Sequence, residues 1–103
     1  MGQVAKLANN LLLWAGVVAV HEALTLGERL GVEPARMREA LLRGSGDSWV
    51  LRELHLINLT WPGKDLAQMI EAAEGTGHPL SLTRRVRELI GWLTRDELRR
   101  LCS

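Results

Sequence analysis

Two polar side chains near the start of an otherwise apolar helical segment have the types and spacing for proton-transfer chemistry. Lys6 and Asn10 are four residues apart, so on a helix they lie on one face about one turn from each other. A lysine there can donate a proton to a developing alkoxide, and a neighbouring carboxamide can orient a substrate hydroxyl or hold the lysine. The same spacing is typical of the solvated start of a long helix, so spacing alone leaves both interpretations open.

Other chemistry-bearing residue types form no strong pattern. The Gly44-Ser45-Gly46 segment exposes backbone N–H groups that could approach a ligand, but such loops also join helices where there is no site. The three histidines lie far apart without paired ligand spacing, so we expect no metal site. The nucleophile-elbow, phosphate-loop and Gly-x-Gly-x-x-Gly dinucleotide patterns are missing from the sequence. We therefore expect no cofactor domain within these residues.

Arginines are concentrated in the last quarter of the chain, where they could form a basic surface. Acidic residues alternate with them, so an ion-paired, solvated face is the favoured interpretation, and a helix-turn-helix DNA binder is the least favoured alternative. The arginines are Arg84, Arg85, Arg87, Arg95, Arg99 and Arg100. The four tryptophans fall on apolar faces or in turns, which indicates core or interface anchors rather than platforms for nucleic-acid bases.

Composition places the chain among globular proteins. The 103 residues are 47% hydrophobic and 24% charged, with a formal net charge of +1. This length fits one domain, and the balanced charge argues against nonspecific binding to nucleic acid or anionic membranes. The single cysteine, Cys102, can form no internal disulfide and has no second thiol for a zinc site, which fits a reducing compartment.

The longest apolar run predicts a buried helix rather than a membrane anchor. It extends from Leu11 to Val20, about half of the roughly 20 residues that span a bilayer. The helical pattern continues through this run without a cleavage site, which argues against a signal peptide. We expect a cytoplasmic protein without a membrane segment.

Hydrophobic periodicity predicts helices throughout and no strand. The first is the longest, from Val4 to Leu30, and Gly31 is its expected C-cap. Further helices are expected over 34–43, from a cap at Asp47 or Ser48 through Ile57, over 64–74 and 80–93, and after a Thr94-x-x-Glu97 capping box. The predicted fold is all-α: one domain over residues 1–103, a helical bundle with a long central first helix.

The first helix is apolar on every side in its middle. A helix of this kind must be surrounded by protein, and a chain of this size has few other helices to surround it. The apolar residues concerned are Leu11, Leu12, Leu13, Trp14, Val17, Val18 and Val20. We therefore expect a second subunit to supply the missing cover, in an intertwined or dimeric assembly.

Five short motifs occur in an order that resembles the C-terminal helical domain of the β-hydroxyacid dehydrogenase family. That family includes 3-hydroxyisobutyrate and 6-phosphogluconate dehydrogenases, and imine reductases are related to it. The motifs are Gly2-Gln3-x-x-Lys6-x-x-Asn9-Asn10, Glu22-Ala23-Leu24 with Gly31, Gly44-Ser45-Gly46-x-Ser48-Trp49, Lys64-Asp65-Leu66, and Gly77-His78-Pro79-Leu80. The resemblance extends from Gly2 to about Leu89.

The resemblance implies roles for particular residues. In such enzymes a Rossmann domain binds NAD or NADP, and the helical domain completes the site and forms the dimer. Lys6 matches the lysine that transfers a proton during hydride transfer, and Asn10 the asparagine that helps hold substrate. Gly44, Ser45 and Gly46, together with Lys64, match positions facing the cleft between the domains, near substrate or the nicotinamide end of the cofactor.

Two functional hypotheses follow. The first is an isolated or truncated C-terminal domain of an NAD(P)-dependent oxidoreductase, which binds no cofactor alone, is inactive alone and needs a separate Rossmann partner. The second is a stand-alone helical module for oligomerisation, interaction or small-ligand binding that retains only the fold. Substitution of Lys6 by Met separates them, because only the first requires the lysine.

Overall fold

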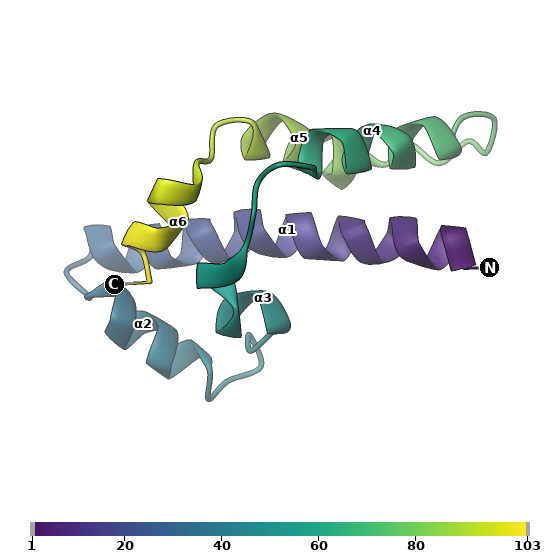
Figure 1. Cartoon of the computed structure of the whole chain (residues 1–103). Helices are drawn as coiled ribbons and strands as arrows, with labels where there is room; N and C mark the ends of the chain where they lie inside the picture. The colour runs from purple at the N-terminus through teal and green to yellow at the C-terminus, as the bar shows by residue number, and fades with distance from the viewer. Residues whose placement is uncertain (1, 103) are drawn as a thin grey trace.

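A computed structural model describes residues 2–102, and every regular element within them is helical (Figure 1). The predicted all-α class with a long first helix is confirmed. The elements are α1 (Gly2–Arg29), α2 (Pro34–Leu41), α3 (Trp49–Arg52), the 3₁₀ turn η1 (Leu54–Leu56), α4 (Pro62–Ala72), α5 (Ser81–Ile90) and α6 (Arg95–Arg100).

Helix α1 is the axis of the molecule. The hairpin of α4 and α5 lies along one side of it, and α2 and α3 lie on the opposite side (Figure 1). Apolar residues of α1 facing these two layers are buried, among them Trp14, Val17 and Leu24. The layers give the molecule an elongated shape of 46 × 25 × 22 Å.

One hydrogen bond joins the middle of α1 to the first turn of α4. The indole Nε1 of Trp14 donates to Oδ2 of Asp65 at 3.0 Å, and the Trp14 side chain is only 5% exposed. Leu66, the next residue of α4, is completely buried. This contact fixes the position of the α4–α5 hairpin along α1.

Two glycines of α1 allow the opposite layer to approach closely. A Cβ atom at Gly16 would lie 3.2 Å from Cγ2 of Val50 in α3, and one at Gly27 would lie 3.0 Å from Cγ of Met37 in α2. Both distances are shorter than ordinary carbon–carbon contacts. The absence of side chains at these two positions therefore sets the distance between α1 and the α2–α3 layer.

The segment after Ser48 differs from its prediction. Ser48 caps α3 as expected, accepting from the Leu51 N–H at 3.0 Å, but the helix ends after four residues instead of continuing to Ile57. Glu53 leaves helical geometry with φ −109° and ψ 21°, and η1 follows. The break lets the chain turn and cross α1 towards α4, as Figure 1 shows, while Leu54 and Ile57 stay buried.

Smaller differences concern helix ends and one buried position. Helix α4 begins at Pro62, which was expected in the preceding turn, because proline is tolerated in the first helical turn. Helical spacing predicts that Met37, Ala40 and Leu41 form the buried stripe of the second helix, but Ala40 is exposed. Helix α5 begins at Ser81, since Leu80 adopts a left-handed conformation with φ 46°.

The last helix is attached to the end of α1. Thr94 caps α6 by accepting from the Glu97 N–H at 3.1 Å, as the sequence predicted. Arg100 donates to Glu28 of α1 and to Glu97 of its own helix. Leu98 of α6 is buried in the hydrophobic core.

By length and composition, α1 is the one helix among residues 2–102 that could cross a membrane. One third of its most apolar stretch is buried within the structure. Core helices of soluble proteins have the same properties, so this feature is weak evidence for a membrane segment.

We predict that Asp65→Ala lowers the free energy of unfolding by about 1–3 kcal/mol, because the buried indole N–H of Trp14 loses its acceptor. Asp65→Asn retains a side-chain oxygen and should lose less. Urea denaturation followed by circular dichroism measures both values. Equal losses in the two variants would mean that the Trp14 hydrogen bond does not stabilise the α1–α4 contact.

We predict that Glu28→Gln destabilises the protein at neutral pH and not in acid. The hydrogen bond from Arg100 holds the pKa of Glu28 below its ordinary value of 4.5. Because this pKa is lower in the folded state, the charged Glu28 carboxylate stabilises the folded protein above pH 4.5. That stabilisation is lost as the pH falls through the folded-state pKa. Denaturation midpoints at several pH values measure the difference between variant and parent.

The matched control is Glu39→Gln. Glu39 pairs with Arg43 at 3.3 Å on the surface, with both side chains mostly exposed. Such a pair contributes little to stability, so this variant should match the parent at every pH. A Glu28→Gln deficit that persists undiminished in acid would contradict the assigned cause.

Candidate functional site

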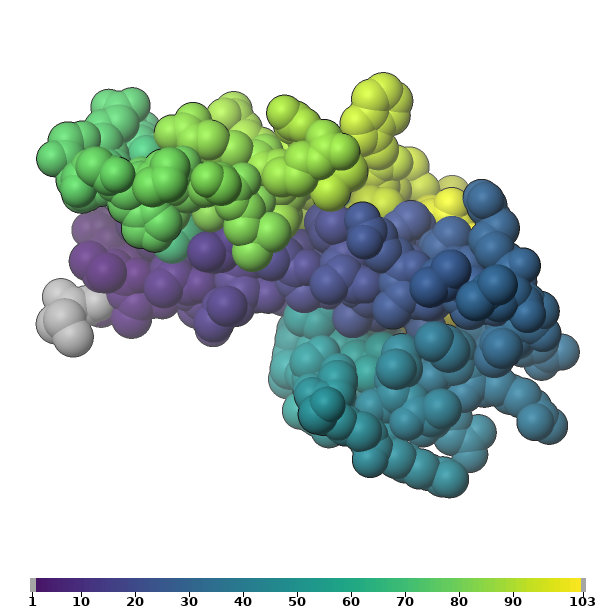
Figure 2. All heavy atoms as spheres, turned by 180° about the vertical axis from the view of Figure 1, so that it is seen from behind, coloured from purple at the N-terminus to yellow at the C-terminus, as the bar shows by residue number. Residues whose placement is uncertain are grey.

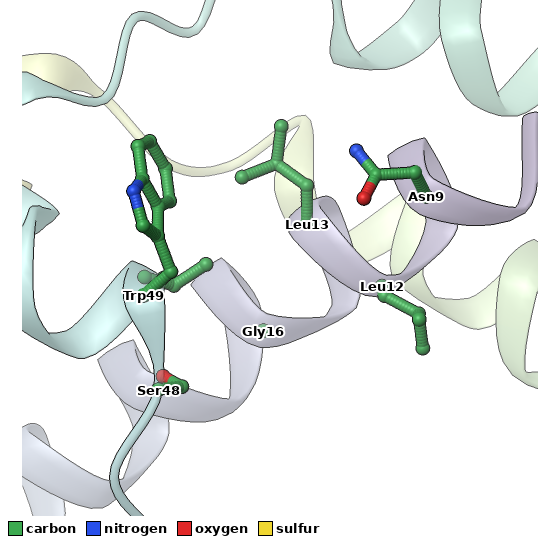
Figure 3. Close-up of a pocket in the computed structure, with 7 residues that line it drawn as sticks. Asn9, Leu12, Leu13, Gly16, Ser48 and Trp49 are labelled. Carbon is green, nitrogen blue, oxygen red and sulfur yellow. The ribbon is translucent and has the colours of Figure 1, made fainter. Parts of the chain in front are cut away.

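A groove of about 530 Å³ lies between the N-terminal half of α1 and the start of α3 (Figure 3). Four of its lining residues come from α1 and three from the chain around the start of α3. They are Asn9, Leu12, Leu13 and Gly16, followed by Ser48, Trp49 and Val50. Gly16 and Val50, which are in close contact, both line the groove.

The groove has apolar walls and two polar side chains. In Figure 3 the carboxamide of Asn9 and the indole of Trp49 lie on either side of Leu13. Ser48 Oγ accepts the capping hydrogen bond from Leu51, so its hydroxyl proton is available to a ligand. None of the lining residues is charged. The groove therefore suits an uncharged part of a ligand that can form one or two hydrogen bonds, with Asn9 and Ser48.

On α1, Lys6 precedes the first lining residue of the groove, Asn9, by three residues, and Asn10 follows Asn9 directly. Both are on one helix, one turn apart, with Lys6 exposed and Asn10 half-buried. Neither lines the groove; their neighbour Asn9 does. An exposed ammonium beside an open groove can exchange a proton with a group bound there or on the surface next to it.

The Gly44-Ser45-Gly46 segment is exposed in the connection between α2 and α3. It does not line the groove, but it leads directly into Ser48 and Trp49, which do. The segment therefore positions the far wall of the groove.

Lys64 lies elsewhere, in the first turn of α4. Its ammonium is 5.6 Å from the ring centroid of Trp61, in a cation–π contact on the surface. The adjoining Asp65 binds Trp14, which is eight residues beyond Lys6, or about 12 Å along the helix axis. The structure thus places Lys64 near the level of Trp14 and does not bring it into one pocket with Lys6.

Sequence reasoning missed Asn9 and Trp49 as lining residues. Asn9 belongs to the first of the five motifs, but the i,i+4 spacing to Lys6 favours its neighbour Asn10 as the site residue. Trp49 was expected to be a core or interface anchor, and its 56% exposure contradicts the core alternative. The Ser48 cap marks Trp49 as the first residue of α3, but no local signal predicts that its side chain lines a groove.

The remaining reactive groups do not join this site. Burial raises the pKa of the Cys102 thiol, opposed by the nearby Arg38 charge, so the thiol is a poor nucleophile at neutral pH. Within residues 2–102 no three His, Cys, Asp or Glu side chains are grouped to hold a metal ion. Three of the C-terminal arginines have acidic or carbonyl partners: Arg84 with Pro79, Arg85 with Glu88, and Arg100 with Glu28 and Glu97.

Comparison with known proteins identifies relatives. A family model described as "NAD-binding of NADP-dependent 3-hydroxyisobutyrate dehydrogenase" matches residues 1–100. The chain is 44% identical over 62 residues to 3-hydroxyisobutyrate dehydrogenase of Pseudomonas aeruginosa, which covers 60% of this chain and 20% of that enzyme. It is 33% identical over 99 residues to 2-hydroxy-3-oxopropionate reductase of Escherichia coli, covering 85% and 34%.

A third relative is 2-(hydroxymethyl)glutarate dehydrogenase of Eubacterium barkeri, with 31% identity over 93 residues, covering 80% of this chain and 31% of that enzyme. The chain thus spans between 20% and 34% of the length of these three relatives. No solved structure matches. Because the family model matches nearly the whole chain, the chain belongs to the β-hydroxyacid dehydrogenase family, as a 3-hydroxyisobutyrate dehydrogenase-like member.

Proposed function

We propose that this chain acts as the C-terminal helical domain of an NAD(P)-dependent oxidoreductase of small hydroxy acids or related compounds. The observation that carries the proposal is the family match over residues 1–100 together with Lys6 and Asn10 one turn apart beside an open groove. In this role the helical domain contributes substrate-binding and proton-transfer groups to a site shared with a nucleotide-binding domain. The relatives' names suggest an enzyme of small-molecule metabolism.

Lys6 is the proposed proton donor and acceptor. Its exposed ammonium can protonate the oxygen that develops negative charge during reduction, or its neutral form can accept the hydroxyl proton during oxidation. Asn10, one turn further, can hold the same hydroxyl or the lysine through its carboxamide. The uncharged groove beside them would receive the part of the substrate that carries no charge.

The cofactor would contact this chain at few positions. A bound nicotinamide supplies the hydride acceptor or donor. Lys64 fits a contact near that reactive end, because its ammonium is exposed at the first turn of α4, where the helix dipole also favours negative charge. The uncharged α1–α3 groove does not fit a pyrophosphate. We therefore propose that a separate nucleotide-binding domain holds the dinucleotide and that this chain alone does not turn over.

A chimera tests the catalytic proposal. In it, this chain replaces the matching segment of the Pseudomonas aeruginosa relative, and NAD(P)H formation from 3-hydroxyisobutyrate is followed by absorbance. We predict that Lys6→Met lowers kcat by about 10²–10⁴-fold, the usual contribution of general acid–base catalysis. The matched control, Arg36→Met, removes an exposed positive charge from α2 and should retain the parent rate.

Two results would contradict the proposal. One is an active chimera whose rate is unchanged by Lys6→Met. The other is hydride transfer by the unmodified chain alone, which would show that residues 1–103 hold the dinucleotide themselves.

A second candidate function, a stand-alone small-ligand or interaction module, is favoured by the groove itself, since residues of one chain line it. Tryptophan fluorescence, compared between the parent chain and a Trp49→Phe variant because the chain has four tryptophans, distinguishes this function. If the chain alone binds a small apolar ligand and Lys6→Met leaves that binding unchanged, the module is supported and Lys6 has no catalytic role.

A further inference from the structure

A second pocket, of about 290 Å³, lies where the middle of α1 meets the end of α5 and α6. Figure 2 shows this part of the molecule, with the end of α5 and the chain after it, in yellow-green and yellow, beside α1, in violet and blue. The pocket shares no lining residue with the α1–α3 groove. Its lining residues are Val18, His21 and Glu22 of α1, Leu89 of α5, Trp92 and Leu93 of the following turn, and Glu97 of α6.

The apolar lining residues of this pocket differ widely in burial. Val18 is 8% exposed, and Leu89 and Leu93 are half-buried. Trp92 is 84% exposed, which makes it the most exposed large apolar side chain within residues 2–102. Tryptophan side chains are mostly buried in folded proteins, and this indole has no such cover. Its ring is therefore available to a ligand in the pocket.

The turn that carries Trp92 is held by hydrogen bonds on both sides. The N–H of Trp92 donates to the Leu89 carbonyl at 3.1 Å, and the N–H of Leu93 donates to the Ile90 carbonyl at 3.1 Å. Thr94 then caps α6 by accepting from the N–H of Glu97. The end of α5 and the start of α6 thus position the indole and the Glu97 side chain in the absence of a ligand.

The charged lining residues of the pocket are carboxylates. No ion pair described within residues 2–102 involves Glu22, whose side chain is exposed. Arg100 contacts Oε1 of Glu97 at 2.6 Å, so Oε2 can accept a further hydrogen bond. A neutral His21 adds a ring nitrogen that can accept another. Since no lysine or arginine lines the pocket, its electrostatics favour a positively charged ligand.

We propose that this pocket binds a small free organic cation, an ammonium group that bears alkyl substituents. A cation is attracted to the face of an indole within about 6 Å of the ring centre, and Trp92 offers that face. Glu22 and Glu97 supply the opposite charge, while Val18 and the two leucines contact the alkyl groups. The volume is close to the lower end of the roughly 300–1,000 Å³ of small-molecule sites, so the ligand is small.

Other ligand classes do not fit this pocket. An anion would face the two carboxylates without a basic partner among the lining residues. For a metal ion, no three His, Cys, Asp or Glu side chains are suitably grouped in the part of the chain that the structure describes, and the apolar residues supply no ligands. The proposal is independent of the oxidoreductase function, because it uses none of the residues assigned to that function.

A titration of the unmodified chain with choline tests the proposal. NMR chemical-shift changes of the backbone N–H groups of Leu89 and Leu93 measure binding, with sodium chloride added to keep the salt concentration constant. The matched control ligand is the neutral carbon analogue of choline, in which a tert-butyl group replaces the trimethylammonium group. A third ligand, N-acetylarginine amide, represents a cationic side chain of another protein.

We expect choline to shift both signals in a saturable way and to bind more tightly than either of the other ligands. Equal binding of the neutral analogue would show a merely apolar pocket, and tighter binding of N-acetylarginine amide would show that the pocket takes a side chain of a partner protein. Either result, or the absence of any shift with choline, overturns the proposal.

Three variants separate the contributions of the side chains. Trp92→Leu should weaken choline binding by about 2- to 30-fold, the range expected for loss of a cation–π contact. Glu22→Gln keeps the shape of the side chain but removes its charge, and should weaken binding by about 2- to 5-fold. The matched control Glu71→Gln removes an exposed carboxylate of α4 that does not line the pocket, and should bind choline as the parent does. Unchanged binding in both Trp92→Leu and Glu22→Gln would contradict the assigned site.

Discussion

The constraint on which this structure depends is the need to enclose α1. Its middle turns are apolar on every side, and such a helix is stable in water only when other groups cover it. The chain covers two sides, one with α4 and α5 and the other with α2 and α3, and α6 reaches its C-terminal end through Arg100 and Glu28. On the third side apolar residues remain exposed, among them Leu12, Leu26 and Leu30.

The same packing determines where chemistry can occur. The Trp14–Asp65 hydrogen bond fixes α4, and therefore Lys64, about two turns from Lys6. On the other side, Gly16 lets α3 approach α1, which forms the groove that Asn9 and Trp49 line. Lys6 and Lys64 thus belong to different regions of this chain. A further domain or subunit would have to bring a substrate to both.

Local patterns predicted most of the fold. Apolar spacing, proline at Pro34, and the caps at Ser48 and Thr94 are short-range signals, and the helices they indicate are present. The break at Glu53 was not predictable, because it comes from the need to cross α1, a long-range requirement with no local signal. The groove was missed for a similar reason: Asn9 and Trp49 are about 40 residues apart and meet only through helix packing.

We expect a second copy of the chain to complete the enclosure of α1, because Leu12, Leu26 and Leu30 are exposed on it. Light scattering coupled to size-exclusion chromatography, at several protein concentrations, measures it directly. The account predicts a particle of twice the chain mass of 11.5 kDa whose mass persists on dilution. A folded particle of 11.5 kDa at every concentration would show that one chain is stable with Leu12, Leu26 and Leu30 exposed, and would contradict the account.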